Sequence, residues 1–141
     1  MSINRRLDEL LPHAGRMLLI DRVVEYDGVR IVCESSSHRA LGHPLAIDGV
    51  LSAVCGLEYG AQAMAIHGAL VSGGERPRVG FLVAARELAW SASRLDTVEA
   101  PITIEAQREF GSDNQVSYAF SLRAAGHEVM RGRASVVLRA P

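Results

Sequence analysis

The chain has 141 residues, the size of one ordinary domain that can bury a core without disulfides or metal. A hydrophobic fraction of 48% excludes a largely disordered chain, and 15 Lys plus Arg against 16 Asp plus Glu leave a net charge of −1. This balance excludes an overall electrostatic bias toward nucleic acid or anionic lipid. We therefore expect a single domain over residues 1–141 with no nucleic-acid partner.

Two further features bear on metal binding and on location. Cys33 and Cys55 have no CxxC spacing and no neighbouring cluster of His or Cys, so we expect two reduced thiols, no metal site and no cofactor. The apolar piece 17–20 is too short for a secretory signal, because it runs directly into Asp21 and Arg22. The expected location is the cytoplasm.

The first part of the chain predicts a hairpin followed by a long loop. Residues 7–11 indicate a short helical turn. Residues 17–26 and 29–33 indicate two strands, and Asp27-Gly28 between them is a two-residue hairpin signal. Residues 35–49 contain Ser, His, Gly and Pro without a clean period, which indicates a connecting loop. Loops of this length in small domains are often functional.

Residues 50–70 form a long apolar stretch that Glu58, Gln62 and His67 interrupt. A helix without a charged face is either a core helix or a membrane span. A span is excluded because Glu58 at its centre costs roughly 2.5 to 3.5 kcal/mol on insertion, and the many small residues offset little of this. We expect a helix enclosed by protein on nearly all sides, ended by Ser72-Gly73-Gly74.

The second part of the chain predicts four strands. Residues 78–90 indicate the first, and alternating residues indicate three more over 102–107, 116–123 and 130–139. Hairpin connections favour an antiparallel sheet with one apolar face, which the single helix must fill. We therefore expect an α+β domain in which a curved antiparallel sheet of about five to six strands wraps a long central helix.

Particular residues strengthen this interpretation. Leu11-Pro12-His13 and the following strand 17–23, Met-Leu-Leu-Ile-Asp-Arg-Val, resemble the start of the hotdog-fold dehydratases that act on 3-hydroxyacyl groups carried by acyl carrier protein. Glu58-Tyr59-Gly60-Ala61-Gln62 resembles the helix signature of that family, and residues 80–82 and 95–96 resemble the segment after the helix. The resemblance covers nearly the whole chain. It is closer still to the dehydratase-like proteins of aryl polyene and related polyketide-type pathways.

The loop before the helix departs from the fatty-acid enzymes of this family. They have Gly-His-Phe-Pro and then a Pro-Gly that opens the helix, whereas this chain has Gly42-His43-Pro44 and Asp48-Gly49. Glu58 follows His43 by 15 residues, one more than the usual family spacing. The resemblance implies His43 and Glu58 as catalytic residues and the backbone N–H of Gly49 as an oxyanion donor.

The chemistry of dehydration suits this pair. A base must remove the proton next to the thioester carbonyl, and an acid must protonate the departing hydroxyl. A neutral His suits the first role. Glu58 suits the second if burial keeps it protonated, and Gln62 would orient it from one helical turn away.

Each residue also has a structural alternative. Glu58 can be a buried carboxylate satisfied by Gln62 and an Arg across an interface, and His43 can be a loop histidine that makes a turn hydrogen bond. His67 is turned roughly half a circle from Glu58, so we expect a core or interface histidine. His13 is expected to be structural, and His38 and His127 show no partner in the sequence pattern.

Three functions therefore remain open at this point. The leading one is dehydration of 3-hydroxyacyl-acyl carrier protein to the trans-2-enoyl product. The alternatives are a hotdog acyl thioesterase and a catalytically weak hotdog subunit that supports an active partner. The resemblance implies a homodimer or a heterodimer with another hotdog chain, and Arg76 and Arg78 are candidates for receiving the acidic carrier protein.

Overall fold

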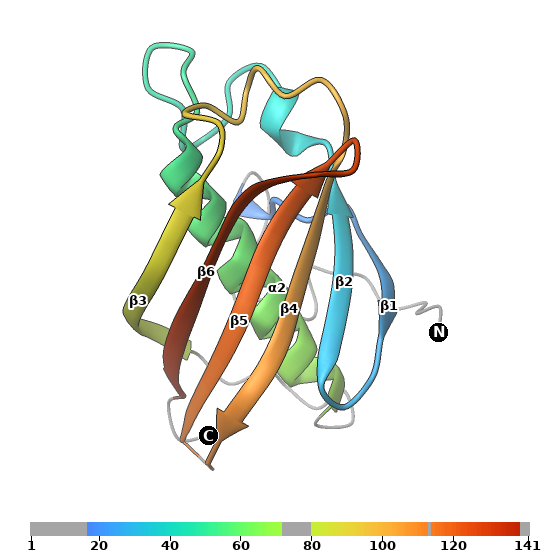
Figure 1. Cartoon of the computed structure of the whole chain (residues 1–141), viewed down its shortest axis with the longest axis vertical. Helices are drawn as coiled ribbons and strands as arrows, with labels where there is room; N and C mark the ends of the chain where they lie inside the picture. Colours follow the sequence, from blue (N-terminus) through green and yellow to red (C-terminus); the bar gives the residue numbers. More distant parts are fainter. Residues whose placement is uncertain (1–16, 72–79, 113, 139–141) are drawn as a thin grey trace.

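The computed structural model describes residues 17–71, 80–112 and 114–138, which form one long helix against one sheet (Figure 1). The strands are β1 (Arg22–Tyr26), β2 (Arg30–Ser35), β3 (Gly80–Trp90), β4 (Ile102–Gly111), β5 (Gln115–Ala124) and β6 (His127–Leu138). The helix α2 covers Gly56–Val71. Two short 3₁₀ turns, η2 (Ser37–Arg39) and η3 (Ala53–Cys55), precede it.

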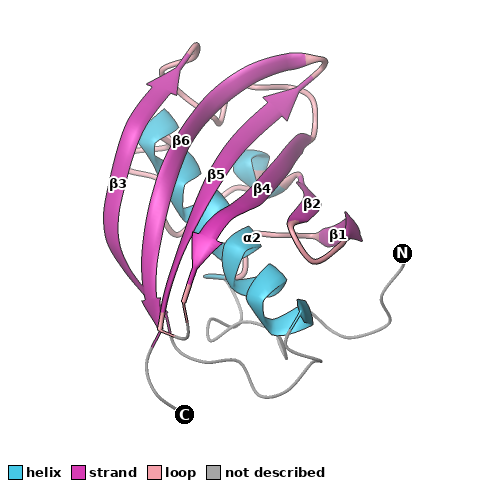
Figure 2. Cartoon of the chain, turned by 60° about the horizontal axis from the view of Figure 1, so that its bottom comes forward, coloured by secondary structure: helices cyan, strands magenta, loops and turns pink. Residues whose placement is uncertain are grey.

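The six strands pair in the order β1-β2-β4-β5-β6-β3, and every pair is antiparallel. The sheet curves across one side of α2 (Figure 2). In β4 the side chains of Ile102, Ile104 and Ala106 are fully buried, whereas the residues between them are partly exposed. This period of two confirms the predicted sheet, and the arrangement confirms the expected α+β domain with a long central helix.

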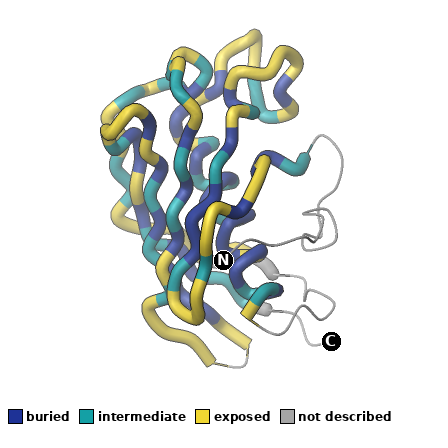
Figure 3. Tube along the Cα trace, turned by 90° about the vertical axis from the view of Figure 1, so that its right-hand side faces the viewer, coloured by how far each residue is buried: buried dark blue, intermediate teal, exposed yellow. Residues whose placement is uncertain are grey.

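The core lies between α2 and the inner face of the sheet (Figure 3). Tyr59, Ala63 and Ile66 lie on the buried side of the helix and have no exposed surface. At Gly60 a Cβ atom would lie 2.7 Å from Cδ2 of Phe120, so the helix approaches β5 at a distance that only glycine permits. This close approach places the residues beside Gly60 in a defined position over the sheet.

The helix starts later than the sequence predicts. It begins at Gly56 rather than at Val50. Asp48 and Gly49 have φ values of 52° and 76°, in the left-handed region, and Ile47 and Val50 exchange two backbone hydrogen bonds around them. This tight turn is incompatible with a continuous helix, so the apolar residues after it enter a loop.

The first strand is also shorter than predicted. It begins at Arg22, because Leu19 directs its backbone groups toward side chains instead of a neighbouring strand. The N–H of Leu19 donates to the amide oxygen of Gln62 at 2.9 Å. Its carbonyl accepts from the hydroxyls of Ser35 at 2.5 Å and Ser37 at 2.8 Å. The segment before β1 is thereby tied both to α2 and to the loop after β2.

One stripe of α2 is less buried than the rest, so the helix is enclosed on most of its sides but not on all of them. Ala65 is exposed, and Glu58 and Ala61 are partly exposed. A Cβ at Gly68 would meet nothing within 4 Å. We call this the open face of α2, defined by Glu58, Ala61, Ala65 and Gly68.

Some predictions fall outside the described residues. They concern the helical turn at residues 7–11, the role of His13, the helix end at Ser72-Gly73-Gly74, and the pair Arg76 and Arg78. Within the described part of the chain, no helix is both long enough and apolar enough to cross a membrane. Those same residues include no group of three or more His, Cys, Asp or Glu side chains placed to hold a metal ion.

Candidate active site

The helix brings Glu58 and Gln62 together, as their spacing predicts. Nε2 of Gln62 donates to Oε1 of Glu58 at 3.1 Å. Gln62 is buried, with 1% of its surface exposed, whereas Glu58 is partly exposed on the open face of α2. The amide therefore holds one oxygen of the carboxyl group of a side chain that is partly exposed.

Gln62 is itself held by the segment before β1. Its Oε1 accepts from the N–H of Leu19 at 2.9 Å, and its Nε2 donates to the carbonyl of Met17 at 2.6 Å. A backbone N–H can only donate and a carbonyl can only accept, so these partners determine which end of the amide is which. Gln62 therefore presents an N–H to Glu58, and the facing carboxyl oxygen acts as an acceptor.

His43 lies in the loop between β2 and α2, and both nitrogens of its ring have partners. The N–H of Leu45 donates to Nδ1 at 3.0 Å, and Nε2 lies 3.1 Å from the hydroxyl oxygen of Tyr59. The first contact is the turn hydrogen bond that the structural alternative predicted for this residue. The second joins the loop to the helix residue that directly follows Glu58.

The hydroxyl of Tyr59 continues this connection to the loop after β2. It lies 2.7 Å from Oγ of Ser37, and Ser37 donates to the carbonyl of Leu19 at 2.8 Å. Burial raises the pKa of Tyr59 to about 12, while its hydrogen bond to Ser37 works in the opposite direction. Tyr59 therefore stays protonated near neutral pH and serves as a hydrogen-bond donor.

Two hydrogen-bonded chains thus meet at one backbone residue. Glu58 reaches the N–H of Leu19 through Gln62, and His43 reaches the carbonyl of Leu19 through Tyr59 and Ser37. The structure brings all three predicted side chains, His43, Glu58 and Gln62, into this connected network. A shift of either group therefore affects the segment that supports the other.

A cavity of about 260 Å³ lies beside this network. Leu18, Leu41 and Pro44 contribute apolar surface to its walls, and Ser37 and His43 contribute polar groups. A mostly apolar cavity with a few polar groups is the usual form of a small-molecule site. Here the polar groups are the members of the network that the loops supply.

The structure does not bring Gly49 into this arrangement. Gly49 lies exposed in the turn between Ile47 and Val50, and in the described residues no contact joins it to His43 or Glu58. The turn is separated from the first residue of α2 by η3. Its backbone N–H therefore does not point from a helix start, which was the basis of the predicted oxyanion role.

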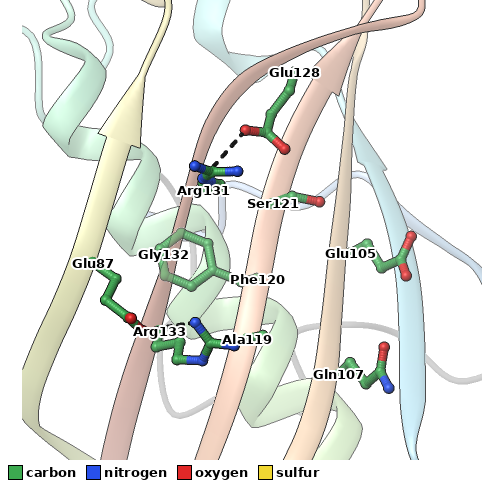
Figure 4. A pocket seen from close by; sticks show the side chains of 10 residues that line it. All are labelled: Glu87, Glu105, Gln107, Ala119, Phe120, Ser121, Glu128, Arg131, Gly132 and Arg133. Atoms are coloured by element: carbon green, nitrogen blue, oxygen red, sulfur yellow. Dashed lines mark hydrogen bonds and ion pairs between the residues drawn. The ribbon is translucent and has the colours of Figure 1, made fainter.

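A larger cavity, of about 510 Å³, lies on the outer face of the sheet (Figure 4). Its charged side chains are paired: Arg133 contacts Glu87 at 2.6 Å, and Arg131 contacts Glu128 at 3.7 Å. None of His43, Glu58 and Gln62 lines it. Exposed ion pairs of this kind are ordinary solvated surface, so the smaller cavity is the better candidate despite its size.

Two other histidines have structural positions. His67 has no exposed surface, lies 2.6 Å from the hydroxyl of Tyr118 through Nδ1, and donates from Nε2 to the carbonyl of Asp27 at 2.8 Å. This confirms the prediction of a core histidine. The expectation that His38 has no partner is wrong, because its Nε2 donates to the carbonyl of Val98 at 2.8 Å.

Sequence reasoning did not identify Tyr59, Ser37 and Leu45 as parts of the site. Tyr59 carries the one visible signal, since a tyrosine within an apolar helix needs a partner for its hydroxyl. Ser37 lies in a run of three serines at the start of the long loop. The contribution of Leu45 comes from its backbone, which no residue pattern reveals.

Comparison with solved structures supports the fold. One chain of "The Dehydratase Heterocomplex ApeI:P from Xenorhabdus doucetiae" matches with a TM-score of 0.82 at 19% identity, over 95% of this chain and 91% of that chain. A hypothetical thioesterase with coenzyme A from Streptococcus pneumoniae matches with a TM-score of 0.62 at 9% identity, over 84% and 85%. Zebra fish thioesterase superfamily member 2 matches with a TM-score of 0.62 at 17% identity, over 92% and 88%. These likenesses confirm the predicted hotdog fold.

Sequence comparison identifies the family. No curated protein sequence matched the chain. The model of the ApeP-like family, described as ApeP dehydratase, matches residues 5–140 and thus includes every residue of the network. The chain therefore belongs to the ApeP-like dehydratase family.

Proposed function

We propose that this protein is a dehydratase subunit that converts a 3-hydroxyacyl group on acyl carrier protein into the trans-2-enoyl group. The observation that carries the proposal is the network that joins Glu58 and His43 beside a cavity in a chain of a dehydratase family. The fold alone does not decide the reaction, because a hypothetical thioesterase and a thioesterase superfamily member share it.

In the proposed reaction a base takes the proton from the carbon next to the thioester carbonyl. The electron pair of that C–H bond forms the new double bond, and the bond to the hydroxyl breaks. Glu58 supplies a proton to the departing oxygen, which leaves as water, and Gln62 holds the carboxyl group in place. His43 is the candidate base, provided that one of its two hydrogen bonds is released during the reaction.

The test is the turnover of a 3-hydroxyacyl-carrier protein, followed by the mass loss of one water from the acyl group. We expect Glu58→Gln and His43→Ala each to lower turnover by about 100-fold or more, while circular dichroism shows an intact fold. Glu99→Gln and His127→Ala are matched controls, because Glu99 is exposed and His127 lies at the exposed start of β6. Full activity in both test variants would contradict the proposal, and release of free thiol would favour a thioesterase.

A second function is favoured by one specific observation. Both ring nitrogens of His43 are engaged by Leu45 and Tyr59, so the resting ring offers no free lone pair to a substrate. A chain of this kind suits a weakly active subunit that works with a second hotdog chain, and the similar structure from Xenorhabdus doucetiae is titled a heterocomplex. The open face of α2, which includes Glu58, is then a surface for that partner.

The two functions differ in what the protein does alone. Turnover by the purified chain without any partner supports the first function. Turnover that begins only when a second hotdog chain is added, and that survives His43→Ala but not Glu58→Gln, supports the second. In that case this chain supplies the carboxyl group and the partner supplies the base.

A further inference from the structure

The contacts of His43 determine where its ring carries the proton. The N–H of Leu45 is only a donor, so Nδ1 accepts from it and a neutral ring must carry its hydrogen on Nε2. Nε2 then donates to the hydroxyl oxygen of Tyr59 at 3.1 Å. The opposite direction, with Tyr59 donating to Nε2, would require both nitrogens to be unprotonated, which does not occur in a neutral imidazole.

The same direction continues along the chain of hydroxyls. The oxygen of Tyr59 accepts from His43, so its single hydrogen points toward Oγ of Ser37 at 2.7 Å. Ser37 in turn donates to the carbonyl of Leu19, which can only accept. The backbone donor at the Leu45 end therefore sets the direction of the hydrogen bonds from His43 through Tyr59 to Ser37, and the backbone acceptor at Leu19 agrees with it.

We propose that Tyr59 is a positioning residue which, together with the N–H of Leu45, holds His43 in one orientation with its proton on Nε2. Tyr59 has no exposed surface and does not line the cavity, whereas His43 does. Tyr59 therefore acts through His43 and not through contact with a bound molecule. The consequence for turnover rests on the proposed function, but the position of the proton does not.

This arrangement has a chemical consequence for a bound thioester. Nδ1 accepts from the N–H of Leu45 and Nε2 donates to Tyr59, so His43 can offer its Nε2 hydrogen to an oxygen in the cavity only by giving up the hydrogen bond to Tyr59. His43 can accept a proton only after the hydrogen bond to Leu45 is broken or the Nε2 hydrogen is passed on. The N–H of Leu45 thus decides which nitrogen carries the proton, and Tyr59 decides where that proton points.

The chain contains a matched control for Tyr59. Tyr118 is also a buried tyrosine whose hydroxyl contacts a histidine, but its partner is His67 in the closed core. Tyr59→Phe and Tyr118→Phe each remove one buried hydroxyl that bonds to a histidine ring. Only the first should affect His43.

The experiment is a long-range proton–nitrogen spectrum of the full ¹⁵N-labelled chain, at a pH where its buried imidazoles are neutral. We expect His43 to show an unprotonated Nδ1 and a protonated Nε2. Tyr59→Phe should shift the Nε2 signal of His43, because Nε2 loses the acceptor of its hydrogen, and Tyr118→Phe should leave that signal in place. A protonated Nδ1 in the unmodified chain would overturn the inference, as would His43 signals that Tyr59→Phe does not change.

Two further measurements protect the test. If Tyr59→Phe does not fold, Ser37→Ala replaces it, because this variant keeps the tyrosine ring and removes the group that accepts from its hydroxyl. His43 signals that move in Ser37→Ala but not in Tyr118→Phe support the chain of hydrogen bonds. His43 signals that move in neither variant contradict it. In turnover assays Tyr59→Phe should lower kcat by about fivefold or more with KM within about twofold, because orientation is lost but binding is not. If the unmodified chain does not dehydrate the substrate, the proposed function is contradicted. The nitrogen spectra would still decide the role of Tyr59.

Discussion

Two histidine–tyrosine pairs lie at opposite ends of α2 and differ in their surroundings. His43 and Tyr59 meet near its start with ring centroids 6.3 Å apart, and His67 and Tyr118 meet near its end at 5.5 Å. Burial raises the pKa of both tyrosines to about 12. The residue types and the burial of the phenols are therefore alike in the two pairs.

The direction of the hydrogen bond is opposite in the two pairs. In the core pair, Nε2 of His67 donates to the carbonyl of Asp27, so Nδ1 accepts from the hydroxyl of Tyr118. In the pair beside the cavity, Nδ1 of His43 accepts from an N–H, so Nε2 donates to Tyr59. The comparison teaches that the backbone group on the far side of the ring decides whether the tyrosine donates or accepts.

Removal of each histidine ring is the variant pair with the largest expected effect on stability, and it tests whether the two pairs differ. We expect His67→Ala to lower the free energy of unfolding by about 3 kcal/mol, because it leaves a core cavity and strands the hydroxyl of Tyr118 and the carbonyl of Asp27. His43→Ala should cost about 1 kcal/mol, because its site borders a cavity that water can enter. Urea unfolding measures both, and equal losses would show that the pairs are not different in kind.

Gly60, the residue after Tyr59, offers the next largest effect. Gly60→Ala should destabilise the fold by about 2 kcal/mol, because the new Cβ would lie 2.7 Å from Cδ2 of Phe120 and the ring must move. The shift should also disturb the nitrogen signals of His43 through Tyr59. A variant as stable as the unmodified chain would mean that the contact between α2 and β5 adjusts easily.

The pH dependence of stability should come from the core pair. Burial lowers the pKa of His67 below its usual 6.5, and the nearby guanidinium of Arg108 lowers it further, while the carbonyl and charge of Asp27 oppose both. The unfolded chain then binds a proton that the folded chain does not, so stability is complete above 6.5 and is lost as the pH falls below that value. Burial lowers the pKa of His38 as well, with the same sign.

His67→Gln separates the two contributions. Urea unfolding at several pH values between about 7.5 and 5 should show a shallower loss of stability in this variant than in the unmodified chain. Burial of His38 contributes to the loss that remains. An unchanged slope would mean that His67 does not titrate with unfolding.

The smallest expected effect comes from the glycine after His67. Gly68→Ala should stabilise the isolated chain by about 0.5 to 1 kcal/mol, because alanine favours the helix and the new Cβ meets nothing within 4 Å. The melting temperature of the two chains measures it. A destabilised variant would show that the open face of α2 is covered in solution.

Sequence patterns predicted the interiors of the elements better than their ends. Alternation identified β4, β5 and β6, and the spacing of Glu58 and Gln62 predicted their contact, since both depend only on local geometry. The start of α2 was wrong because Leu51 is held by a distant loop. Its N–H donates to Asp96 at 2.9 Å, and its carbonyl accepts from Leu95 at 2.8 Å.

The candidate site shows the same division. His43, Glu58 and Gln62 could be predicted because they stand in motifs that resemble a dehydratase family. Tyr59 and Ser37 could not be joined to His43 from the sequence, because their contacts connect three segments that only folding brings together. The predicted role of Gly49 relied on a helix start at that point, and α2 begins at Gly56 instead, so the role stays a prediction without that support.

The amino-acid sequence by itself determined the architecture and the family of this protein. An apolar helix between strands of alternating polarity buries its surface by packing on the apolar face of the sheet that the strands form. The carboxyl group of Glu58 and the amide of Gln62 are one helical turn apart and therefore meet. The tertiary structure alone decided how the site is protonated. The position of the proton on His43 depends on the backbone N–H of Leu45 and on the hydroxyl of Tyr59 in α2. Nearly every residue has a backbone N–H, so only the folded structure shows which one faces the histidine ring.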